Sequence, residues 1–260
     1  MENETNNEGV SSSRKTSNPA LRKDTFTGLA VVDSSEAMNL QGVVNKAGFL
    51  IALVVISAAF IWSQYFYEGV LDPGVIPVAL VCVPIALITA LVTIFKKNLA
   101  LYTAPIYALA EGVTLGIISC LFEQRYPGIV IQAVGLTFGT FAALLIAYST
   151  RLIKPTENFK LGVAAATGGI ALFYLASMIT GFFGYQMPLI HESGIYGIGF
   201  SVFVVIIAAL NLVLDFDFIE QGVRMRAPKY MEWYSAFGLL VTLIWLYLEI
   251  LRLLSKARSK

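Results

Sequence analysis

The stretch "AALNLVLDFDFIEQG", residues 208–222, joins an apolar run to three carboxylates, Asp215, Asp217 and Glu220, within six residues. The apolar run begins near residue 195 and has the ~20 residues that a helix needs to cross the hydrocarbon core of a bilayer. Asp near the centre of such a helix is disfavoured by ~2.5–3.5 kcal/mol, so acids at its end need a physical reason. The stretch predicts a membrane-spanning helix with an acidic mouth.

The composition of the whole chain supports a membrane protein. Its 260 residues are 57% hydrophobic and 13% charged, with mean hydropathy +0.73, well outside the range of soluble domains. Strands of a membrane barrel are excluded, because the apolar runs lack period-two alternation and are about twice too long. The fold class is therefore all-α and polytopic, with seven transmembrane helices at 47–67, 74–95, 99–122, 129–149, 160–183, 195–214 and 235–254.

Three parts of the chain follow from this pattern. We expect a disordered cytoplasmic tail at 1–45, a seven-helix transmembrane domain at 46–255 and a basic tail at 256–260. The first apolar segment follows about 45 polar residues instead of the initiator Met, so we expect an anchor and not a cleaved signal peptide. The short joints hold Pro, Gly and charge and leave no room for a soluble domain.

Orientation is predicted from basic residues in the short loops, which stay on the cytoplasmic side during insertion. Most basic loop residues fall on the side that also carries the amino terminus, so we expect the amino terminus to be cytoplasmic. We expect a multi-pass protein of the plasma or inner membrane. An odd number of spans places the basic end of the chain outside, so the last segment either spans or re-enters as a broken hairpin; its apolar length favours spanning. The cytoplasmic side carries Lys46, Lys96, Lys97, Arg151, Lys154, Lys160, Arg224, Arg226 and Lys229.

Several function classes are disfavoured by the residue inventory. A net charge of +1 provides no field for nucleic acid. His191 is the only histidine, and Asp215 and Asp217 are two residues apart on one helix and point to different faces, so we expect no enzyme, no cofactor and no resident metal. Cys82 and Cys120 fall inside spans and behave as small hydrophobes.

Two further acids lie inside apolar spans. Glu111 has no local partner and is either a buried protonated acid or a functional group. Glu249 precedes Arg252 by three residues, so it either forms an ion pair on one helix face or belongs to an ion pathway. Small residues spaced by four, as in Gly112 and Gly116 or Gly135 and Gly139, predict a tight bundle.

Four segments carry a resemblance to a known family: "NPALRKDTF", "APIYALAEGVTLGIIS", "YPGIVIQAVGLTFGTFAALL" and "ALNLVLDFDFIEQG". From about residue 18 to 255 the chain resembles the Bax inhibitor-1-like membrane proteins, in particular a bacterial branch similar to the YccA group. The resemblance implies two layers of three helices around a central seventh. It further implies a pH-sensitive calcium leak channel, or else a partner that restrains a membrane-anchored AAA protease.

The resemblance also implies a gate made of two aspartates that share a proton, one at the end of the sixth predicted helix (195–214) and one on the seventh (235–254). Asp215 or Asp217 stands at the first position, and Thr242 stands at the second. Glu249 lies ~10 Å further along helix seven and cannot take that place without a change of register. Asn211 lies four residues before Asp215 and makes that face polar, which favours Asp215 over Asp217 as the inward residue.

The expected function is a pH-sensitive calcium or cation leak, gated by buried carboxylates near the cytoplasmic end of helix six. Its partners are the lipid bilayer and calcium ions or protons. The alternatives are a non-transporting protein that modulates a membrane protease, and a helix terminus whose charges only anchor it among the lipid headgroups. The gating or ion-pathway candidates are Asp215, Asp217, Glu111, Glu249 and Asn211, and the candidate locking partners are Arg224 and Arg226.

Overall fold

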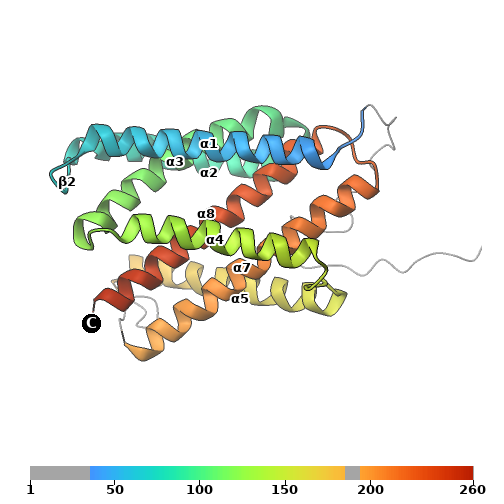
Figure 1. Ribbon diagram of the computed structural model, residues 1–260. Coiled ribbons are helices and arrows are strands. Elements are labelled where there is room, and N and C mark those ends of the chain that lie inside the picture. Colours follow the sequence, from blue (N-terminus) through green and yellow to red (C-terminus); the bar gives the residue numbers. More distant parts are fainter. Residues whose placement is uncertain (1–35, 185–193, 260) are drawn as a thin grey trace, which may run out of the picture.

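The computed structural model describes residues 36–184 and 194–259, and most of them lie in helices (Figure 1). Seven of these helices are long and apolar enough to cross a membrane, which confirms the expected all-α architecture. A short hairpin of two antiparallel strands, β1 (Phe66–Tyr67) and β2 (Val70–Leu71), joins the first two of these helices. The helices are α1 (Leu40–Tyr65), α2 (Ile76–Phe95), α3 (Ala100–Arg125), α4 (Ile129–Ser149), α5 (Glu157–Phe182), α7 (Ile195–Arg224) and α8 (Met231–Arg258).

Several helix ends differ from their expected positions. Helix α1 begins at Leu40 instead of residue 47, because Asn39 caps it by accepting a hydrogen bond from the Gly42 amide at 2.7 Å. Residues 40–45 are therefore helical and not part of a disordered tail, while residues 1–35 lie outside the described residues. Helix α7 continues through the acidic stretch to Arg224, and α8 runs from Met231 to Arg258.

Helix α8 lies at the centre of the bundle and contacts α1, α3, α4 and α7. Helices α1, α2 and α3 form one layer beside it, and α4, α5 and α7 form the other (Figure 1). The expected arrangement of two three-helix layers around a seventh helix is confirmed. Helix α8 is uninterrupted, so the chain ends on the opposite side of the bundle from the start of α1.

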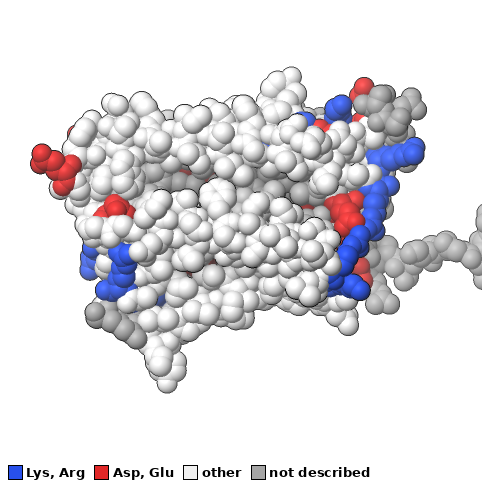
Figure 2. All heavy atoms as spheres, viewed as in Figure 1, with Lys and Arg blue, Asp and Glu red and all other residues white. Residues whose placement is uncertain are grey.

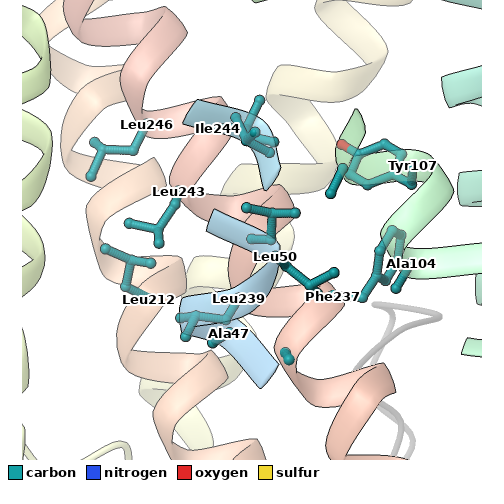
Figure 3. Close-up of a cluster of buried hydrophobic side chains, with 14 of the residues drawn as sticks. Ala47, Leu50, Ala104, Tyr107, Leu212, Phe237, Leu239, Leu243, Ile244 and Leu246 are labelled. Atoms are coloured by element: carbon teal, nitrogen blue, oxygen red, sulfur yellow. The ribbon is translucent and has the colours of Figure 1, made fainter. Parts of the chain in front are cut away.

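The core consists of aliphatic side chains gathered around α8. Leu243 and Leu246 of α8 pack with Leu50 of α1 and Leu212 of α7, and Phe237 packs edge-on against Tyr107 of α3 (Figure 3). Large apolar residues also cover the outside, so burial inside the bundle and contact with lipid use the same residue types. Figure 2 shows the result on one face, an uncharged band between two charged ends.

We call the end at which α1 begins and α7 ends the basic end. Its exposed or partly exposed cations are Lys46, Lys96, Lys97, Arg151, Lys154, Lys160, Arg224, Arg226 and Lys229. The other end, where α8 finishes, is the opposite end. Every helix therefore has one terminus at each end, as a bundle of spanning helices requires.

Close helix packing is confirmed for only part of the small-residue pattern. A Cβ added to Gly112 would lie 2.0 Å from Ser57 Oγ, and one added to Gly116 would lie 2.9 Å from the Ala58 carbonyl oxygen. These two glycines let α3 approach α1 closely. The prediction is wrong for the other glycines singled out, since nothing lies within 4 Å of a Cβ added at Gly135 or Gly139.

Candidate functional site

The first acid of the α7 stretch, Asp215, is buried between helices. Asp215 is 9% exposed. It lies nine residues before the end of α7, which is ~14 Å from that end by the rise of an α-helix. The Thr242 hydroxyl of α8 faces this carboxyl, and the same hydroxyl donates to the Gly238 carbonyl oxygen at 3.2 Å. The second carboxyl oxygen, Oδ2, is buried with no hydrogen-bond partner among the described residues. A buried polar atom without a partner costs about 1–3 kcal/mol, so Oδ2 gains free energy from accepting a hydrogen bond or binding a cation.

Asn211 lies one turn before Asp215 on the same inward face of α7. Its amide Nδ2 donates to the Ile207 carbonyl oxygen at 2.8 Å and to Thr167 Oγ1 of α5 at 2.7 Å. The amide is thereby fixed toward α5, whereas the carboxyl of Asp215 turns toward α8. The polar face of α7 thus connects the central helix with the layer that contains α5.

Asp217 has a different environment from Asp215, because a rotation of roughly 200° separates residues two apart on a helix. Its carboxylate forms an ion pair with Lys160 near the start of α5 and accepts a hydrogen bond from Gln221. The sequence argument counted Lys160 only among the loop charges. Its pairing with Asp217 could not be found from spacing, since the two residues meet only after α5 packs on α7.

Glu220 is the acid that the arginines of the basic end reach. It accepts a hydrogen bond from the Tyr148 hydroxyl of α4, and its Oε1 lies 3.3 Å from an Arg151 nitrogen. Arg224, a candidate locking partner, pairs with Glu220 and with neither aspartate. Arg226, the other candidate, lies exposed in the turn after α7 with a φ of 48°.

The three acids of α7 therefore have three separate settings. Asp217 and Glu220 each meet a basic side chain at the surface of the basic end. Asp215 has no ion pair with any residue in 36–184 or 194–259 and is the most deeply buried of the three. It is the one acid of this stretch placed on the interface with the central helix.

Glu249 lies on α8, two turns after Thr242, and is 2% exposed. Arg252 Nη1 donates to its Oε1 at 2.8 Å, and the Tyr174 hydroxyl of α5 donates to the same oxygen at 3.0 Å. Trp245 Nε1 adds a further contact at 3.3 Å. Glu249 is thus a fully satisfied member of a buried ionic cluster, which joins α8 to α5 and does not include Asp215.

Glu111 is half-buried on α3. It lies one turn after Tyr107 and one turn before Leu115, which are both buried, so it shares their face of the helix. Among the described residues it has no hydrogen bond or ion pair. The structure provides no bonded link between Glu111 and the acids of α7.

A buried carboxylate that the sequence argument missed is Glu232, in the first turn of α8. It is 0% exposed, and its Oε1 accepts hydrogen bonds from the backbone N and from Nδ2 of Asn39, each at 3.0 Å. Its other oxygen forms an ion pair with Lys46 of α1. The sequence placed this residue in a loop, since the helix was expected to start at residue 235. An acid directly before an apolar run was the available signal.

The same contact region holds the chain before α1 in place. The Met38 amide donates to the Ala227 carbonyl at 2.7 Å, and the Lys229 amide donates to the Glu36 carbonyl at 3.0 Å. Together with Glu232, these bonds fasten the start of α1 to the turn between α7 and α8. The basic end is therefore held together by backbone and ionic contacts between the start of α1, the turn after α7 and the first turn of α8.

Asp215 can hold a proton or offer a carboxylate oxygen to a cation, because its Oδ2 accepts no hydrogen bond from the described residues. The residue across the interface is a neutral hydroxyl and not a second carboxyl. The site is thus a single acid beside a threonine on the central helix.

One comparison with known proteins identifies a family for this chain. The family model described as Bax inhibitor 1 like matches residues 7–259, nearly the whole chain. No curated protein and no solved structure matches it.

Proposed function

This chain belongs to the Bax inhibitor 1 like family, and from that premise we propose that it conducts a pH-sensitive leak of cations, calcium among them, across the cell membrane. The observation that supports the proposal is the unpartnered Oδ2 of Asp215 beside the central helix. Calcium binds to carboxylate, hydroxyl and carbonyl oxygens, and Asp215 and Thr242 supply the first two. No chemical conversion is part of this proposal.

The proposed gate depends on the charge state of one buried acid. A protonated Asp215 is neutral and leaves the α7–α8 interface without a cation ligand. An ionised Asp215 places a negative charge that no basic side chain of the described residues neutralises, so it attracts either a cation or a proton. Occupancy of the interface therefore follows pH through a single residue and not through a carboxyl pair.

The remaining candidates receive more peripheral roles. Asp217 and Glu220, with Lys160, Arg151 and Arg224, form the charged mouth at the basic end, and those cations act as locks by holding the mouth acids. Asn211 orients the polar face of α7. Because basic loop residues favour the cytoplasmic side, we propose that the basic end and the amino terminus are cytoplasmic and that the membrane is the plasma or inner membrane.

Reconstituted protein tests the leak directly. Liposomes that contain the protein and an internal calcium dye should show influx that changes with external pH, and empty liposomes should not. Asp215→Asn keeps the size of the side chain and removes its charge, so we expect it to lose the pH dependence. Asp217→Asn is the matched control and should keep it. A profile unchanged by Asp215→Asn would exclude Asp215 as the gate.

A second candidate function is supported by Thr242. The resemblance implies a second acid at this position, and its replacement by a neutral hydroxyl favours a member of the family that does not transport. Such a protein would act by contact, modulating a membrane-anchored AAA protease. Absence of flux at every pH, together with crosslinking of a protease in cells, would favour this candidate over the leak.

A further inference from the structure

A groove in the outer surface of the bundle reaches the central helix. It has a volume of about 490 Å³ and is walled by α1, α3 and α4, with α8 at its floor. Figure 2 shows the surface hollowed between α1 and α4 in the uncharged band. Ala58 and Ala59 of α1 and Gly116 of α3 line it, and their small size leaves the space unfilled.

The groove is continuous with the lipid-facing surface. Val55 of α1 is 54% exposed and Ile131 of α4 is 73% exposed at its rim, whereas Leu243 of α8 at its floor is 5% exposed. The rim residues belong to helices long and apolar enough to cross the membrane, so the mouth of the groove opens into hydrocarbon and not into water.

The groove has the length of one lipid leaflet. It runs along α1 from Ile51 to Trp62, which is ~16 Å by the rise of an α-helix. Half of the hydrocarbon core is ~15 Å. Trp62 lies near the opposite end, where the interfacial region is expected and where aromatic rings are enriched.

Its polar lining groups are already hydrogen-bonded. Ser119 Oγ and the Tyr247 hydroxyl bond each other at 2.7 Å, and Thr137 Oγ1 donates to the Ala133 carbonyl at 2.7 Å. Glu123 caps the start of α4, since its Oε2 accepts from the Val130 amide at 3.1 Å. A polar ligand would find little to bind there, while an apolar chain would cover exposed methyl groups.

We propose that this groove is a binding site for one acyl chain of a membrane phospholipid, which packs against Leu243 and Ile244 of the central helix. Ordinary lipid around the protein touches the outer faces of the helices. Only a chain inserted between α1 and α4 reaches α8 from this side. The bound chain would cover the exposed rim residues of α1 and α4 and would pack on the small part of Leu243 and Ile244 that stays exposed, 5% and 8%.

Photolabelling can test this proposal. The full-length protein is placed in nanodiscs of phosphatidylcholine with a diazirine at the middle of the acyl chain, and carbene adducts are mapped by mass spectrometry after illumination. We expect adducts on residues 240–247 of α8 as well as on exposed α2 residues such as Leu80 and Leu87. Labelling of α2 without labelling of α8 would overturn the proposal.

Groove-filling variants provide the control. Ala59→Phe should lose most of the α8 adducts and keep the α2 adducts, and Val134→Phe serves the same purpose should the first variant not fold. Ala171→Phe, on the exposed face of α5, should keep both. Undiminished α8 labelling in a folded Ala59→Phe protein would contradict the site. The proposal would also be contradicted if α8 adducts form in nanodiscs with one copy of the protein but not in nanodiscs with two copies. In that case a second copy of the protein, and not a lipid chain, would fill the groove.

Discussion

Asp215 of α7 meets the hydroxyl of Thr242 on α8, and its Oδ2 is left without a hydrogen-bond partner among the described residues. This contact joins the acid stretch to the central helix at the position where the resemblance implies a second carboxyl. Two carboxyls in contact at these positions would share a proton, whereas a carboxyl beside a hydroxyl titrates as a single acid. The neutral Thr242 beside Asp215 therefore distinguishes the proposed gate of this protein from the two-aspartate gate that the resemblance implies.

Restoring a carboxyl at that position should change the pH response. Thr242→Asp places two like charges side by side, so the pair retains a proton to higher pH than Asp215 alone. We expect the midpoint of calcium flux in liposomes to move to higher pH, while Thr242→Asn, of similar size and neutral, leaves the midpoint where it is. Identical profiles for both variants would show that Thr242 does not face the titrating group.

Glu249 is expected to matter for stability and not for gating. Glu249→Gln removes the charge that Arg252 and Tyr174 bind inside the bundle and leaves a partly buried arginine unpaired. Breaking a buried pair in this way costs about 3–5 kcal/mol, and the partial exposure of Arg252 brings the expected loss to roughly 2 kcal/mol. Denaturant titration in micelles measures that loss. A flux profile with a shifted pH midpoint would instead place Glu249 on the ion path.

The Glu232 contact should control the attachment of α1 to α8. Glu232→Gln weakens the ion pair with Lys46 and the bonds to Asn39, so the free energy of unfolding should fall by roughly 2–3 kcal/mol. Amide hydrogen exchange should rise first in residues 36–46. Glu36→Gln, a nearby exposed acid, is the control and should leave exchange unchanged. Equal exchange in all three proteins would contradict a fastening role.

Topology can be tested by labelling in intact cells. With Cys82 and Cys120 replaced by Ala, a cysteine at Tyr67 in the β1–β2 hairpin should react with an impermeant thiol reagent, because that hairpin lies at the opposite end. A cysteine at Lys154, at the basic end, should react only after the cells are permeabilised. The reverse pattern would place the basic end outside.

The sequence alone determined the fold class and the number of spans. Apolar runs of about twenty residues have only one stable form in lipid, the helix, so the seven spans follow from composition and length. Helix ends were less accurate: Leu40 begins a helix before its apolar run because the Asn39 side chain caps a turn made of polar residues, and Met231 begins one before residue 235. Hydropathy cannot register such caps.

The partners of the acids were decided by the tertiary structure. The i, i+3 spacing was enough to pair Glu249 with Arg252, and the face shared by Asn211 and Asp215 follows from helical periodicity. No spacing relates Asp217 to Lys160 or Glu232 to Lys46, which are separated by whole helices and meet only when the layers pack. Hydropathy also cannot separate an apolar residue that faces lipid from one that faces another helix. The physical reason is the same for both: in lipid, the choice of face depends on close packing between helices and on polar groups finding partners, and both depend on which helices become neighbours.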